Sequence, residues 1–135
     1  MKLFQITMAF IFIITSTLFS ATLTNQIKSH DFMVKSYSKS LESENAGVRN
    51  SALLQIVKLN LLYPNKQNSA FIKKLNGMGA NDPQLWIRMN ARLAALILKN
   101  PTLTEIVSPV GYVDANKYFS DLFLKMSGTT IAMVK

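Results

Sequence analysis

Residues able to support chemistry are few in this chain, and their spacing predicts neither a catalytic site nor a metal site. The single histidine, His30, stands beside Asp31, whereas a metal ion needs three or four ligands and the chain has no cysteine. The seven acidic residues fall mostly at expected helix ends, where capping explains several of them, so no carboxylate pair remains for acid–base catalysis. Phosphate-binding glycine patterns and serine-nucleophile motifs are absent from the sequence. We therefore expect a protein that is not an enzyme and holds no cofactor or metal ion.

A basic strip on one expected helix is a better candidate, and its chemistry is the binding of a protein partner. Arg88, Arg92, Ala95 and Lys99 recur at intervals of four, three and four residues, which places them on one helix face. Trp86 lies near the start of this strip. Because Trp and Arg dominate protein interfaces, the candidate contacts for an acidic partner are Trp86, Arg88, Arg92 and Lys99. The alternative is that the strip is only the solvated edge of a buried helix, with Arg88 held in a bridge between helices.

Apolar residues at helical spacing must supply the scaffold for this strip. They predict helices over about residues 25–42, 48–63, 68–79, 82–100 and 114–128. Prolines, glycines and capping aspartates indicate the helix boundaries, namely Pro64, Gly77, Gly79, Asp82, Pro101, Asp114 and Gly128. No segment reads as a convincing strand, and residues 129–135 are open to a frayed end or a short docked strand. The expected fold is all-α, with about five helices joined by short loops.

Two of the expected helices begin with similar sequences. Residues 43–57 (SENAGVRNSALLQIV) align with residues 82–96 (DPQLWIRMNARLAAL) at an offset of 39 residues. The alignment pairs Val48 with Ile87, Arg49 with Arg88, and Ala52 with Ala91. A polar turn, a β-branched residue followed by Arg, and an inward-facing Ala three positions later resemble the second helix of a HEAT or armadillo-like repeat.

This resemblance implies a right-handed stack of antiparallel helices in HEAT-like hairpins, covering about residues 25–100. In that family the carboxylate of the turn and the Arg of the helix bridge neighbouring repeats, which implies this role for Asp82, Arg88 and Arg49. Arg92 has no role in the family pattern, so we expect its side chain to be free. Two copies are fewer than the three or so that usually support a stack. The resemblance therefore also implies that the helix around Tyr118 caps the open end, or that the protein self-associates as a homo-oligomer.

The N-terminal residues have the layout of a secretory signal peptide. Lys2 is followed by an apolar stretch from Ile6 to Phe19, and small residues at positions 20 and 21 provide a cleavage zone. We expect residues 1–21 to be a signal peptide that is cleaved near residues 20–22, and residues 22–135 to form a single domain. The alternative is an uncleaved anchor, because residues 3–23 are about long enough to cross a bilayer.

The net charge of +8 makes the chain basic, but its lysines are mostly scattered singly. Such scatter is typical of a solvated surface and argues against a nucleic-acid site, where basic residues cluster. We expect a non-enzymatic, exported interaction module that binds another envelope or secreted protein. The alternative is a basic envelope-associated protein that binds anionic lipid or polymer electrostatically.

Overall fold

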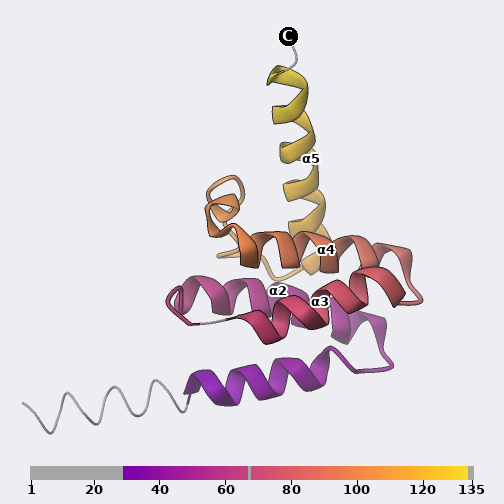
Figure 1. Ribbon diagram of the computed structural model, residues 1–135. Coiled ribbons are helices and arrows are strands. Elements are labelled where there is room, and N and C mark those ends of the chain that lie inside the picture. The colour runs from indigo at the N-terminus through magenta and orange to yellow at the C-terminus, as the bar shows by residue number, and fades with distance from the viewer. Residues whose placement is uncertain (1–28, 67, 134–135) are drawn as a thin grey trace, which may run out of the picture. The chain divides into compact units, whose positions relative to one another are not determined.

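The computed structural model describes residues 29–66 and 68–133, and every regular element in these ranges is a helix (Figure 1). Residues 29–40 form the first described helix. The following elements are α2 (Ala46–Leu62), α3 (Ser69–Asn81), α4 (Leu85–Lys99), the short 3-10 helix η1 (Pro101–Glu105) and α5 (Ala115–Met133). The expectation of an all-α fold is therefore confirmed.

The chain divides into two compact units, Met1–Val34 and Lys35–Lys135. The expected signal peptide at residues 1–21 lies outside the described residues. Within the described ranges, no helix is both long enough and apolar enough to span a bilayer. Helices α2 to α5, and all the features that they position, belong to the second unit.

Side-chain caps start two of the helices. Asn45 Oδ1 accepts hydrogen bonds from the backbone amides of Gly47, at 2.8 Å, and Val48, at 3.3 Å, which satisfies two of the amides left open at the start of α2. Asp114 Oδ1 does the same for the first turn of α5, with the Asn116 amide at 2.8 Å. The expected cap at Asp114 is thus confirmed.

The core of the second unit forms where α4 meets its neighbours. In Figure 1, α3 runs opposite to α2, and α4 reverses direction again, so α2 and α4 run the same way. Helix α4 packs against both α2 and α3, and α5 packs against α2 and α4. Apart from Pro109, the largest fully buried side chains come from α2, α3, α4 and α5: Leu53, Leu54, Ile56, Val57, Leu75, Ile87, Ile97, Tyr118, Phe119 and Leu122. Because α4 lies in the middle, its sequence decides how the others are placed.

The expected end of the third helix at Gly77 and Gly79 is wrong. Helix α3 continues through both glycines to Asn81. A glycine that ends a helix adopts a positive φ, and among the described residues only Gly111, with φ of 89°, does so. Gly79 instead permits close packing, because a Cβ atom there would lie 2.8 Å from Cγ of Arg92 on α4. The glycine serves contact between two helices rather than termination of one.

Three smaller expectations also need correction. Helix α4 begins at Leu85 after Gln84, not at Asp82, although the Asp82 carboxylate accepts a hydrogen bond from the Gln84 amide. Gly128 lies inside α5, which runs on to Met133, so no strand forms over residues 129–133. Val48, expected on the buried face, is 43% exposed, whereas its aligned counterpart Ile87 is fully buried.

Candidate partner-binding site

The outer face of α4 exposes a row of large apolar side chains. Leu85, Met89, Arg92, Leu96 and Lys99 recur at helical spacing and are all exposed. The three apolar members, Leu85 (62% exposed), Met89 (44%) and Leu96 (37%), form the apolar row of α4. Exposed apolar rows of this kind commonly mark interaction surfaces in soluble proteins. Of the strip expected from the sequence, Arg92 and Lys99 are exposed and Arg88 is half-buried.

The basic residues of the predicted strip lie along the edge of α4 that faces α3. Ala95, expected between them, is buried at 2% exposure, so the strip is not a continuous exposed face. Arg88 Nη1 donates to the backbone carbonyl of Asp82 at 2.6 Å, as expected for a residue held by the preceding turn. Arg92, expected to be free, is not, because its Nε donates to the carbonyl of Gly79 at 2.8 Å. Lys99 is exposed in the last turn of α4.

Trp86 belongs to a groove on the opposite edge of α4, where this helix meets α5. The groove has a volume of about 280 Å³. It is lined by four residues of α4 and four of α5: Trp86, Met89, Asn90, Leu93, Asn116, Phe119, Ser120 and Phe123. We call it the α4–α5 groove. Phe119 is buried in it, whereas Trp86 is 37% exposed and Phe123 is 48% exposed, so the groove offers apolar surface to a ligand.

Three asparagine side chains support this groove from below. Asn90 Nδ2 donates to Asn50 Oδ1 at 2.9 Å, and Asn50 Nδ2 donates to Asn116 Oδ1 at 3.0 Å. These residues come from α4, α2 and α5, and Asn50 and Asn90 are buried. The network therefore fixes the two walls of the groove to the underlying helix α2. Sequence reasoning missed it, although three asparagines within otherwise apolar helices were a visible sign.

A buried ion pair joins the start of α2 to the turn before α4. Arg49 Nε donates to Asp82 Oδ2 at 2.8 Å, and Arg49 Nη2 donates to Asp82 Oδ1 at 2.9 Å. Arg49 Nη1 also donates to the carbonyls of Ser43, at 2.8 Å, and Glu44, at 3.0 Å. The Asp82 carboxyl loses solvation through burial, yet hydrogen bonds from Arg49 and the Gln84 amide outweigh this cost and lower its pKa. The pair is fully committed to structure and offers no reactive group.

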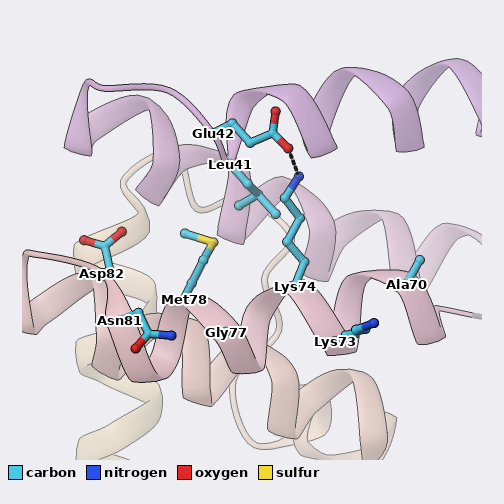
Figure 2. A pocket seen from close by; sticks show the side chains of 9 residues that line it. All are labelled: Leu41, Glu42, Ala70, Lys73, Lys74, Gly77, Met78, Asn81 and Asp82. Carbon is cyan, nitrogen blue, oxygen red and sulfur yellow. Dashed lines mark hydrogen bonds and ion pairs between the residues drawn. The ribbon is translucent and has the colours of Figure 1, made fainter.

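A second and larger pocket, of about 570 Å³, lies between the turn at residues 41–42 and α3 (Figure 2). Figure 2 shows Lys74 of α3 reaching across to Glu42, with Nζ 2.6 Å from Oε1. Lys74 Nζ also donates to the carbonyl of Ser38, and its hydrogen bond and charge lower the pKa of Glu42. Asp82, which also lines this pocket, is held by Arg49. Since these charges already pair with one another, the α4–α5 groove is the stronger candidate site.

His30 and Asp31 are the remaining candidate residues of the sequence analysis. In the first unit, His30 Nδ1 lies 3.4 Å from Asp31 Oδ1, so the structure does bring these two side chains together. Within the described ranges, no group of three or more histidine, cysteine, aspartate or glutamate side chains is placed to hold a metal ion.

The α4–α5 groove and its surroundings are the candidate binding surface of the described residues. The groove combines exposed aromatic side chains with a neighbouring apolar row, and guanidinium groups border that row on the other side. Comparison of the chain with models of protein families, with curated proteins and with solved structures finds no match.

Proposed function

We propose that this chain is a non-enzymatic helical module that binds another envelope or secreted protein through the α4–α5 groove and the apolar row of α4. The observation that carries the proposal is the gathering of exposed large side chains, including Trp86, Met89 and Phe123, around one groove. Aromatic residues in a well-packed hollow are typical anchors of protein interfaces. The groove is also rigid, because the asparagine network ties both of its walls to α2.

We also propose that the scaffold is built from two HEAT-like repeats. Arg49 and Arg88 are each the fourth residue of their helix, and each donates from Nη1 to the carbonyl six residues earlier, Ser43 and Asp82 respectively. Ala52 and Ala91, three positions further on, are both buried. Identical local hydrogen bonds at the same offset of 39 residues support a repeated unit. The Arg49–Asp82 ion pair, which joins the two aligned segments, also supports the proposal.

The second candidate function is electrostatic binding to anionic lipid or polymer. It is favoured by the net charge of +8 and by the exposed Arg92 and Lys99 beside the apolar row. An interfacial helix, however, usually carries cations along its whole polar face. Here the cations lie on one edge of α4 only, and carbonyls hold Arg88 and Arg92. The other edge is a concave groove, which suits a protruding side chain better than a flat bilayer.

Export to the envelope is part of the proposed function, because the N-terminal sequence has the layout of a signal peptide. The test is N-terminal sequencing of the protein isolated from its host. We expect a start near residues 21–23 in an extracytoplasmic fraction. A cytosolic protein that begins at Met1 would contradict the proposal.

Site-specific photo-crosslinking in host cells tests the binding surface. A photoreactive residue at Met89, in the groove, should join the chain to one defined partner, whereas the same residue at Lys73, exposed on α3, should not. Phe123→Ala should abolish the Met89 crosslink without loss of helicity, because the exposed ring contributes little to the core. Capture from Lys73 and Met89 alike would argue against a dedicated site. High salt should leave the crosslink intact if apolar contacts dominate, and should remove it if binding is electrostatic.

A further inference from the structure

The two arginines that occupy equivalent positions in α2 and α4 differ in how much of their hydrogen-bonding capacity is used. Both donate from Nη1 to the carbonyl of the preceding turn. Arg49 then uses Nε and Nη2 to hold the two oxygens of Asp82, at 2.8 and 2.9 Å. In the described part of the chain, Nε and Nη2 of Arg88 form no such hydrogen bonds, and Arg88 is only half-buried. Its charge helps to lower the pKa of Asp82, but the oxygens of that carboxylate are held by Arg49. Arg88 is thus held through Nη1, and its Nε and Nη2 are not among the buried side-chain atoms that lack a partner.

We propose that Arg88 receives a carboxylate from the partner protein in the way that Arg49 receives Asp82, while an apolar side chain of the same partner segment enters the α4–α5 groove. The inference rests on the proposed protein-binding function and adds the chemistry of the partner. A guanidinium with Nε and Nη2 exposed side by side matches the two oxygens of one carboxylate. The Arg49–Asp82 pair is a direct template for this geometry within the same molecule.

The order of chemistries across α4 defines the partner further. Arg88, Arg92 and Lys99 lie along one edge, the apolar row follows, and the groove that contains Trp86 comes last. A partner segment that matches the basic edge, the apolar row and the groove has acidic residues beside an apolar stripe. This is the pattern of an acidic amphipathic helix. The groove volume of about 280 Å³ accommodates one large aliphatic or aromatic side chain.

Charge complementarity favours this partner over a second copy of the chain. An antiparallel two-fold pairing of two α4 helices about their middle would bring Arg92 of one copy toward Arg92 of the other, and like charges across an interface are strongly unfavourable. A partner with acidic residues neutralises the same groups.

Trp86 provides the readout, because it is the only tryptophan of the chain and lines the groove. The full chain is titrated with a series of amphipathic helical peptides that carry a stripe of Leu and Phe. Each peptide has one Asp at a different position beside the stripe. Each is compared with a control peptide that has Asn in place of that Asp. At least one Asp peptide should shift the Trp86 emission and bind about 10- to 100-fold more tightly than its Asn counterpart, the range for a hydrogen bond to a charged group. Arg88→Gln should abolish this difference, whereas Lys73→Gln, a charge control at an exposed position of α3 outside this surface, should preserve it.

Because Arg88→Gln also removes the bond to the Asp82 carbonyl, its helicity is checked by circular dichroism. If that variant does not fold, the comparison of Asp and Asn peptides on the unchanged protein still tests whether the surface binds a carboxylate. Equal binding of each Asp and Asn pair, or no binding of any peptide, overturns the carboxylate assignment. A Trp86 shift produced by anionic phospholipid vesicles and by no peptide assigns the surface to lipid. A shift with protein concentration alone assigns it to a second copy, and both results contradict the proposal.

Failure of this inference is separable from failure of the proposed function. If Arg88→Gln retains the crosslink from position 89 in host cells and Phe123→Ala loses it, the protein-binding module stands and only the carboxylate contact is wrong. If neither variant changes the crosslink, the Phe123 ring does not anchor the partner, and the proposed binding mode in the groove is wrong. Loss of the crosslink in the unchanged protein contradicts the groove itself.

Discussion

Arg49 and Asp82 form a two-point ion pair that closes the start of α2 onto the turn before α4, with both nitrogen–oxygen distances below 3 Å. Their side chains are 10% and 4% exposed, so the charges are almost fully removed from water. The Asp82 carboxylate accepts from the Gln84 amide as well, and its backbone carbonyl accepts from Arg88. A single aspartate therefore organises two helices and the approach to the candidate binding surface.

Removal of the Asp82 charge should be strongly destabilising. In Asp82→Ala the Arg49 guanidinium remains buried without a counter-charge, which costs about 3–5 kcal/mol in comparable sites. Urea unfolding followed by circular dichroism measures the loss. The matched control is Glu42→Gln, which breaks the more exposed pair with Lys74 and should cost much less, because water screens exposed pairs. Equal effects of the two variants would mean that the buried pair has no special role.

Acid should weaken the fold through the same carboxylate. The pKa of Asp82 is lowered in the folded state, so its contribution to stability is complete above the ordinary aspartate pKa of about 3.9. The contribution is lost as the pH falls from there through the lower folded-state pKa. Urea midpoints measured between about pH 6 and about pH 2 should fall less steeply for Asp82→Asn than for the unchanged protein. Parallel curves would contradict the assigned role of Asp82.

Helix locations followed from the sequence more closely than helix ends did. Apolar spacing predicted α2 and α4 to within a few residues, because both bury one continuous face. The end of α3 was predicted wrongly because Gly79 was interpreted as a helix terminator. This glycine instead makes room for Arg92, and this contact joins residues 13 positions apart in different helices. Local patterns do not contain that information, since a glycine that ends a helix and one that admits a neighbour look alike in sequence.

The candidate site was predicted only in part, for a similar reason. Trp86 and Arg88 stood out by residue type, and both border the candidate surface. Phe123 and Asn116 join the same groove from α5, and nothing in the spacing of a single helix relates them to Trp86. Arg92 was expected to be free because it has no role in the repeat pattern, but the carbonyl of Gly79 lies within its reach.

The two glycines of α3 should respond in opposite ways to alanine. A Cβ at Gly77 meets no atom within 4 Å, so Gly77→Ala should gain about 0.5–1 kcal/mol from helix propensity. At Gly79 the same Cβ would lie 2.8 Å from Arg92 Cγ, and overpacking of this kind costs about 1–3 kcal/mol. Thermal unfolding of both variants checks the sign of each change. Arg92→Ala added to Gly79→Ala should recover part of the loss, because it removes the atom in the way.

The aligned alanines Ala52 and Ala91 should both resist enlargement. They are 3% and 0% exposed, and replacement of either by Leu should overpack the core at a cost of about 1–3 kcal/mol. Ala80→Leu, at an exposed position of α3, is the size-matched control and should change stability little. If only one of the two buried positions responds, the two helices do not occupy equivalent places and the repeat proposal loses its packing basis.

The hydroxyl of Tyr118 offers a test of the core at the other end of the pH scale. The side chain is fully buried, and among the described residues no group accepts or donates a hydrogen bond at its Oη. Burial, with a smaller contribution from the charge of Tyr112, raises the pKa of Tyr118 to about 12. A raised folded-state pKa means that the contribution to stability is complete below the ordinary tyrosine pKa of about 10, and is lost as the pH rises through about 12.

Tyr118→Phe should therefore have two effects that point in the same direction. At neutral pH it removes a buried polar group without a protein partner and should raise the free energy of unfolding by about 1 kcal/mol. Between pH 10 and pH 12, about the interval between the ordinary and the raised pKa, the variant should lose less stability than the unchanged protein. The ring still packs edge-on against Phe119, at 5.1 Å between centroids, so the apolar contact is retained. A variant that is destabilised at neutral pH would mean that the Tyr118 hydroxyl has a hydrogen-bond partner in solution. The surroundings of this hydroxyl would then be more hydrated than its packing indicates.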